Sequence, residues 1–201
     1  YGKPIPMTEE DIQDVVNRFV FTAKIARESG FDGIQLHSAH GYLLSQFLSP
    51  DINQRSDAWG GSLENRARIH LEIIKKCREE VGNDFAISIK MNSADFQKGG
   101  FSPEDSIQVA KLFSDSGIDN IEISGGTYEQ PRLLGLDKVS INPKRSENRK
   151  ESTVAREAYF LSYAEEIAKV VNIPLMVTGG FRTKEGMEAA LRDGACEIVG
   201  V

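Results

Sequence analysis

The sequence has few of the residues that build cross-linked, zinc-stabilised or membrane-embedded proteins. Its two cysteines, Cys77 and Cys196, lie far apart and form no CxxC pair. This excludes a disulfide framework and a zinc ribbon. No apolar run reaches the length that crosses a bilayer, and the first residues carry no signal-peptide pattern. These absences exclude a membrane-spanning protein and lead us to expect a reducing, cytoplasmic compartment.

A strong charge excess is also lacking. Thirty acidic residues stand against 24 basic ones, a net charge of −6, without a dense cluster of lysine and arginine. A nucleic-acid-binding surface is therefore not expected. The basic stretch 144–150 is interrupted by Glu147 and is interpreted as a solvated loop. With 40% apolar and 27% charged residues, the 201 residues match an ordinary globular domain.

What the sequence does contain is a regular alternation of helical and strand patterns. The first helical pattern opens with Thr8-Glu9-Glu10-Asp11, a capping-box motif, and ends at Gly30. Strands are predicted over 31–37, 85–91, 119–124, 174–178 and 196–201. Helices are predicted over 8–30, 62–81, 102–117, 153–171 and 183–193. This alternation is typical of parallel βα units, and no change of composition marks a second domain.

The two faces of the predicted strands differ in polarity. Ile87 and Ile89 share one face of their strand, whereas Ser88 and Lys90 share the other, and Glu122 lies between two isoleucines. An open sheet covered by helices on both sides would be apolar on both faces. A single apolar face favours a (β/α)8 TIM-type barrel, in which helices cover the outside and polar residues lie inside, near the carboxyl ends of the strands.

The predicted strands are too few to close such a barrel. Five are recognised, and closure requires eight. We therefore expect a single domain over residues 1–201 that is an incomplete (β/α)8 barrel, part of a longer polypeptide. Exposed sheet edges would favour association with another copy, so a homo-oligomer is expected.

The most informative polar residues follow the first predicted strand. His37, His40 and Tyr42 lie within six residues, and Gly41 allows a sharp turn between them. Imidazoles can donate hydrogen bonds to a carbonyl oxygen, and a tyrosine hydroxyl can deliver a proton. The spacing alone also fits two hydrogen-bonded loop histidines with an aromatic ring packed behind them. Zinc is disfavoured because no carboxylate or cysteine lies at ligand spacing.

Two other positions are candidates for ligand binding. Lys90 shares the inner strand face with Ser88, although a lysine at a strand end can also extend into solvent. Gly179-Gly180 precedes a helix that starts at Thr183, an arrangement that suits a phosphate but also occurs in ordinary tight turns.

Other features are given structural or undecided roles. Cys77 is interpreted as a small core residue, Trp59 as a packing residue, and His70 as a surface or half-buried helix residue. The connection 127–152 is long enough to be functional, either at a substrate pocket or at a subunit contact.

Several longer motifs resemble one known family. They are HSAHGYL at 37–43, QFLSP at 46–50, GGSLENR at 60–66, IKMNSADF at 89–96, SGGTY at 124–128 and VTGGFRT at 177–183. Together they closely resemble the signature of the old yellow enzyme family, the FMN-dependent NAD(P)H:flavin oxidoreductases that are often ene-reductases. The resemblance covers essentially the whole chain and aligns it with the fourth to eighth strands of the family's barrel.

The resemblance implies an activity and a role for each candidate residue. It implies FMN as cofactor, NADH or NADPH as reductant and an electron-poor alkene, such as an α,β-unsaturated carbonyl, as substrate. His37 and His40 would bind the carbonyl oxygen and Tyr42 would be the proton donor. Lys90 takes the place of a basic residue at the flavin N1/O2 edge, and Gly179 and Gly180 that of a phosphate contact.

Two alternatives to this activity remain open from the sequence. One alternative is that the chain belongs to a related flavin barrel, that of a multidomain flavin/iron–sulfur reductase or amine dehydrogenase. It could also be a catalytically silent barrel fragment. With three strands of the pocket absent, the 201 residues alone are expected to bind FMN poorly or not at all.

Overall fold

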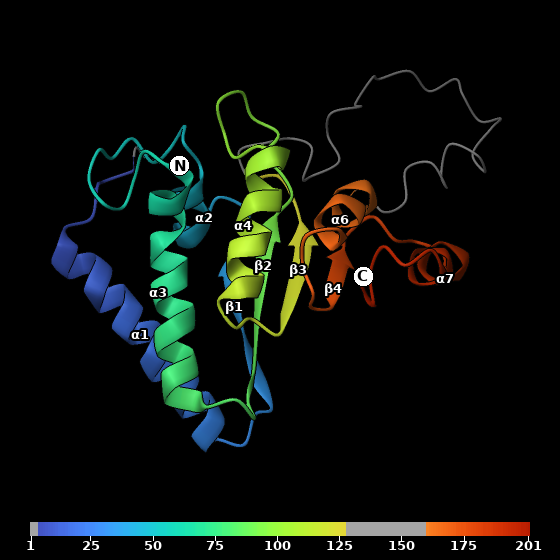
Figure 1. Cartoon of the computed structure of the whole chain (residues 1–201), viewed down its shortest axis with the longest axis horizontal. Coiled ribbons are helices and arrows are strands. Elements are labelled where there is room, and N and C mark those ends of the chain that lie inside the picture. The colour runs from blue at the N-terminus through green and yellow to red at the C-terminus, as the bar shows by residue number, and fades with distance from the viewer. Residues whose placement is uncertain (1–3, 128–159) are drawn as a thin grey trace, which may run out of the picture.

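Five parallel strands form the centre of the molecule. The computed structural model describes residues 4–127 and 160–201. Within them the strands form one sheet in the order in which they occur in the chain, with β1 and β5 at its edges. Figure 1 labels the strands β1 to β4 of this sheet. The strands are β1 (Gly33–Ser38), β2 (Ala86–Asn92), β3 (Asn120–Ser124), β4 (Leu175–Thr178) and β5 (Ile198–Gly200). All their pairings are parallel.

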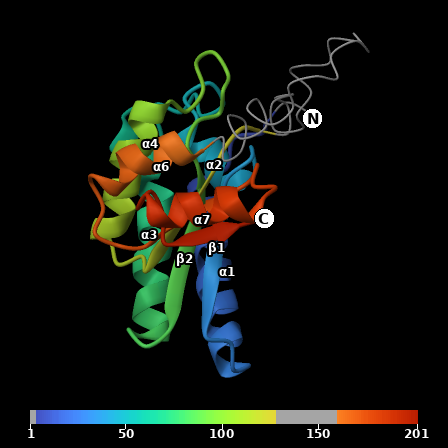
Figure 2. The same ribbon diagram turned by 90° about the vertical axis from the view of Figure 1, so that its right-hand side faces the viewer.

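Helices connect the strands and cover one side of the sheet. They are α1 (Glu9–Glu28), α2 (Leu43–Leu48), α3 (Leu63–Val81), α4 (Pro103–Asp115), α6 (Leu161–Ala168) and α7 (Lys184–Arg192). A side view shows α3, α4 and α6 on the same side of the strands (Figure 2). Consecutive parallel βα units with the helices outside form part of a (β/α)8 barrel, which confirms the predicted fold class. Among the described helices, none combines the length and apolarity needed to cross a membrane.

Local capping signals explain where the helices begin. Thr8 and Asp11 form the predicted capping box of α1, with each side chain bonded to the other residue's backbone N–H. Ser62 and Ser102 are the N-cap residues of α3 and α4. The side chain of each serine accepts a hydrogen bond from the backbone N–H three residues further along the chain. Each such cap stabilises its helix by about 1 kcal/mol. The starts of these helices therefore follow from the sequence alone.

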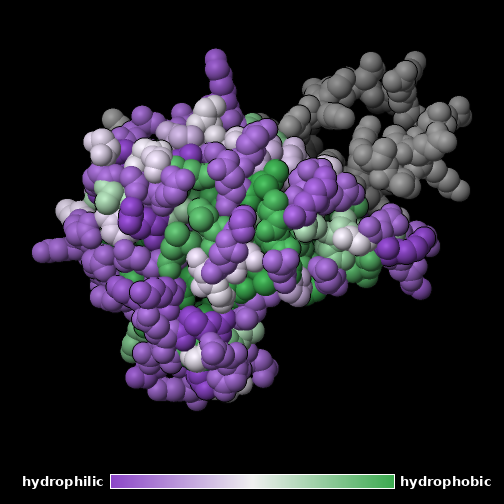
Figure 3. All heavy atoms as spheres, viewed as in Figure 1, coloured by the Kyte–Doolittle hydropathy of each residue, from purple (hydrophilic) through white to green (hydrophobic). Residues whose placement is uncertain are grey.

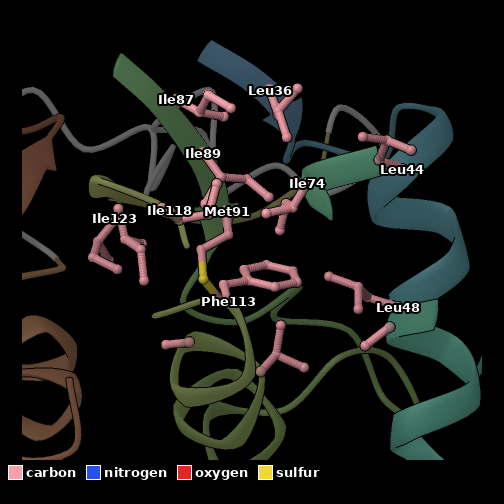
Figure 4. Close-up of a cluster of buried hydrophobic side chains, with 14 of the residues drawn as sticks. Leu36, Leu44, Leu48, Ile74, Ile87, Ile89, Met91, Phe113, Ile118 and Ile123 are labelled. Carbon is pink, nitrogen blue, oxygen red and sulfur yellow. The ribbon is translucent and has the colours of Figure 1, made fainter. Parts of the chain in front are cut away.

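The main hydrophobic core lies between the strands and the helices. Strand side chains that face outward point toward apolar side chains of the helices (Figure 4). The labelled residues of this cluster are Leu36, Leu44, Leu48, Ile74, Ile87, Ile89, Met91, Phe113, Ile118 and Ile123. The solvent side of the helices is mostly hydrophilic (Figure 3). This confirms the predicted division of the sheet into an apolar outer face and a polar inner one.

Neither a helix nor a strand was predicted from the sequence between residues 38 and 61, but this stretch contains α2. This helix has six residues and buries Leu44, Phe47 and Leu48. Six residues are too few to show a helical period, so packing rather than pattern reveals it. Of the helix predicted over 153–171, the structure describes only residues from 160 onward. The connection 127–152 lies outside the described residues except for Thr127.

The predicted exposure of His70 is wrong. It was expected at or near the surface, but α3 packs this side against β1 and His70 is fully buried. Its Nε2 lies 2.8 Å from Ser38 Oγ, and its ring centre is 5.3 Å from that of Phe113. Burial lowers the pKa of His70 to about 3. Cys77 and Trp59 are buried, as predicted, and Cys77 is a free thiol.

Buried neutral His70 is expected to make the fold acid-sensitive. Below pH 6.5 the unfolded chain binds a proton at this imidazole and the folded chain does not, so the free energy of unfolding decreases until the pH reaches the folded pKa of about 3. Between pH 7 and pH 5 the loss from His70 is about 2 kcal/mol. His70→Gln keeps a hydrogen-bonding side chain but cannot titrate. Urea unfolding at both pH values should show the wild type losing about 2 kcal/mol more than the variant, and equal losses would contradict this assignment.

Candidate active site

A row of charged and polar side chains crosses the inner face of the sheet. In the register of the strands, His37 of β1 lies beside Lys90 of β2, and Lys90 lies beside Glu122 of β3. All three are on the face opposite the helices. Lys90 Nζ lies 2.8 Å from Glu122 Oε1, and the side chains are 18% and 6% exposed. The cation predicted at this position therefore points into the barrel interior and is paired there with a carboxylate.

His37, His40 and Tyr42 come together where β1 ends. The ring centre of His37 is 5.5 Å from that of His40 and 5.2 Å from that of Tyr42. His40 and Gly41 both have positive φ values, 65° and 83°, which turn the chain sharply after the strand. Tyr42 then begins α2 as its N-cap residue. The structure thus brings together the three side chains that the sequence singled out.

The turn at His40 is held by two neighbouring strand ends. The backbone N–H of His40 donates to Asn92 Oδ1 at 3.1 Å, and His40 Nε2 lies 2.8 Å from Ser124 Oγ. Asn92 in turn donates to Asp95 Oδ1. A left-handed conformation costs a residue other than glycine about 1 kcal/mol or more, and it persists where neighbours hold it. Asn92 and Ser124 therefore fix the position of the His40 ring.

The pKa values of His37 and His40 are both lowered, which favours their uncharged forms. Burial is the main cause that lowers the pKa of His40 to about 4, with additional lowering by Lys90 and His37. The pKa of His37 is also lowered, first by burial and then by Lys90. The negative charge of Glu122 acts in the opposite direction and raises the pKa of both imidazoles. A neutral imidazole donates one hydrogen bond, so the pair can hold an oxygen atom without bringing a positive charge.

Glu122 is held from two sides. Its Oε1 pairs with Lys90, and its Oε2 accepts a hydrogen bond from Gln35 Nε2 at 2.7 Å. Burial alone would raise the pKa of Glu122, but the hydrogen bond from Lys90 and further contacts outweigh it and lower the pKa. Glu122 and Gln35 were not among the candidate site residues predicted from the sequence. The available signal was a charged residue in the middle of an otherwise apolar strand.

Gly179 and Gly180 directly follow β4, at the same carboxyl ends of the strands where the histidine cluster lies. β4 is two strands away from β2, which carries Lys90. The φ values of the two glycines are 108° and 85°, a region that favours glycine. The chain continues into α7, where Thr183 is the N-cap and accepts from the backbone N–H of Gly186. A glycine turn next to the start of a helix presents backbone N–H groups and the positive end of the helix dipole, which suits an anion. Within residues 4–127 and 160–201, no group of acidic, histidine and cysteine side chains could hold a metal ion.

Comparison with known proteins identifies relatives over the whole chain. Residues 2–201 match the model of the NADH:flavin oxidoreductase / NADH oxidase family. The chain is 40% identical to the NADH-dependent flavin oxidoreductase iliE of Hypocrea jecorina, over 100% of this chain and 48% of that protein. It is 38% identical to an NADH oxidase of Thermoanaerobacter brockii, over 99% of this chain and 28% of that protein.

Solved structures agree with these relatives. A 2-naphthoyl-CoA reductase matches with a TM-score of 0.83 and 30% identity, covering 98% of this chain and 28% of that one. An old yellow enzyme homologue from Zymomonas mobilis matches in fold, with a TM-score of 0.73 and 23% identity, covering 100% of this chain and 50% of that one. The chain spans about half the length of iliE and about a quarter of the NADH oxidase. The family match extends over nearly every residue, so the chain belongs to the NADH:flavin oxidoreductase / NADH oxidase family, with the old yellow enzyme fold.

Proposed function

We propose that the chain forms the substrate side of an FMN-dependent ene-reductase. The enzyme would use NADH or NADPH to reduce an electron-poor alkene, such as an α,β-unsaturated carbonyl. The observation that carries the proposal is the gathering of His37, His40 and Tyr42 in one cluster, in which His37 is paired in register with the inward-facing Lys90. These groups provide oxygen binding, a proton and a cation at one edge of the sheet.

The residues present fit FMN. Lys90 provides a cation on the inner face, where it would meet the N1/O2 edge of the ring system. Gly179 and Gly180, next to the start of α7, suit the phosphate. Bound FMN would supply the hydride chemistry that links NAD(P)H to the β-carbon of the alkene.

The side chains of this chain would perform the remaining steps. His37 and His40 hold the carbonyl oxygen of the substrate with hydrogen bonds, which strengthen as negative charge builds on that oxygen. Tyr42 lies beside His37 and is 44% exposed, so its side chain borders the space in which a substrate would be held. It gives its proton to the α-carbon, which completes the addition of two hydrogens across the double bond.

A second candidate function has support from chain length. The T. brockii NADH oxidase and the 2-naphthoyl-CoA reductase are each covered to 28% by this chain. Such lengths leave room for further redox domains beside the flavin barrel. The chain would then be part of the barrel of a multidomain flavin reductase, with the same cluster at its substrate site. Electron entry from a second centre, rather than directly from NAD(P)H, distinguishes this candidate.

Flavin loading tests the proposal in the protein expressed from its complete coding sequence. We expect it to bind FMN and the FMN to be bleached by NADH or NADPH without oxygen. Lys90→Met removes a charge-assisted contact worth about 1.5–3 kcal/mol, so FMN should bind roughly ten- to a hundredfold more weakly, measured by fluorescence titration. Lys111→Met, on the outer surface of α4, is the control. A protein that binds no FMN, or a Lys90→Met variant that binds it as well as the control, would contradict the proposal.

A further inference from the structure

Glu122 is a buried charged group that the proposed reaction does not use. It lies in the middle of β3, is 5% exposed and faces the barrel interior between two outward-facing isoleucines. Its carboxylate is held by Lys90 at 2.8 Å and by Gln35 Nε2 at 2.7 Å. Gln35 Nε2 also lies 3.0 Å from Ser88 Oγ. The carboxylate is therefore fixed in position by side chains of the neighbouring strand β2 and of β1, one strand further along the sheet.

The packing around position 122 does not require a carboxylate. In the next strand the position paired with Glu122 is Met176, an apolar residue, so this row of the inner face accommodates apolar side chains. A buried ion pair contributes little to stability, because removing two charges from water costs about as much as their attraction returns. The role of Glu122 is thus better sought in the electric field that it creates.

That field extends to the ends of the strands. Glu122 and Lys90 act with opposite sign on the pKa of both His37 and His40. Any ligand that rests against Lys90 therefore experiences a lysine whose charge is largely balanced by a carboxylate 2.8 Å away. A reduced flavin carries negative charge at the edge that Lys90 would face. A free cation would favour reduction there, and an adjacent carboxylate opposes it.

We propose that Glu122 is a positioning residue that fixes the Lys90 ammonium and offsets its charge, and that it thereby holds the reduction potential of the flavin below the value a free lysine would impose. This inference rests on the proposed function, in which FMN lies against Lys90. Gln35 supports the arrangement by binding the second oxygen of the carboxylate.

The midpoint potential of the flavin-loaded protein tests the inference. Glu122→Gln removes the negative charge and keeps the size of the side chain. We expect reduced FMN to become about tenfold more favoured over oxidised FMN, a rise of about 30 mV for a two-electron couple. Glu122→Asp keeps the charge and should stay close to the wild type. Glu79→Gln, on the exposed side of α3, makes the same change of net charge away from the barrel interior and should not alter the potential.

A second readout needs no flavin. In the FMN-free protein, NMR titration of His37 should show its pKa falling further in Glu122→Gln, because the group that raises it is gone, and returning in Glu122→Asp. FMN that binds normally with an unchanged potential in Glu122→Gln would overturn this inference and leave the proposed function intact. A potential that rises equally in Glu122→Asp would overturn it as well, since charge would not be the cause. Failure of the wild type to bind FMN would overturn both proposals.

Discussion

Replacing Tyr42 with phenylalanine is expected to slow reduction of an enone about 10²–10⁴-fold, the range that general acid catalysis contributes. Reduction of the flavin by NAD(P)H should remain unchanged. The variant removes the hydroxyl and keeps the ring, which packs 5.2 Å from the ring of His37, so the shape of the site is preserved. Only the proton for the α-carbon is lost.

Stopped-flow absorbance separates the two half-reactions. The bleaching of FMN by NADH reports the first, and its reoxidation by an enone such as cyclohexenone reports the second. Tyr163→Phe, on α6, removes the same hydroxyl from an aromatic residue outside the cluster and serves as control. If reoxidation by the enone is as fast in Tyr42→Phe as in this control, Tyr42 is not the proton donor.

Replacing His40 with alanine is expected to reduce enone turnover about 10²–10³-fold. This is the usual effect of removing one hydrogen-bond donor to an oxygen atom on which negative charge develops. Alanine cannot donate to the carbonyl oxygen. It also fits the backbone at φ 65° less well than asparagine, which adopts this region several times more often than most residues. His40→Asn retains a donor and tolerates the turn, so it should lose much less activity than His40→Ala.

The comparison of the two His40 variants isolates the hydrogen bond. Steady-state kcat and KM for the enone are measured together with the FMN content and the Tm of each variant. His40→Ala with normal FMN content should lose activity, and His40→Asn should restore most of it. If both variants are equally slow at equal FMN content, the ring of His40 matters for a reason other than donation to the substrate oxygen.

Much of the fold follows from local patterns in the sequence. The capping box at Thr8 and the serines at 62 and 102 define helix starts, because each cap involves residues only three positions apart. The alternation of Ile87 and Ile89 with Ser88 and Lys90 predicted which side of β2 meets the helices. Short elements and burial were less predictable. Helix α2 has too few residues to show a period, and His70 is buried only because α3 packs this side against β1.

The candidate site also has features that could be predicted from the sequence and features that could not. His37, His40 and Tyr42 are close in the chain, so their spacing already indicated that one turn could gather them, and the family resemblance selected Lys90, Gly179 and Gly180. The partners of these groups could not be predicted. Gln35 and Glu122 are 87 positions apart in the sequence, and His40 and Asn92 are 52 apart.

Local patterns in the sequence were enough to predict the order of the strands and of the longer helices, the polarity of the sheet faces and the candidate site residues, since these depend on neighbours within a few residues. The three-dimensional structure was needed to show that Lys90 is paired with Glu122, that Asn92 and Ser124 hold His40, and that the pKa values of His37 and His40 are lowered. The reason is physical. Pairing, burial and pKa depend on the register between strands, which brings distant residues to within hydrogen-bonding distance and removes them from water.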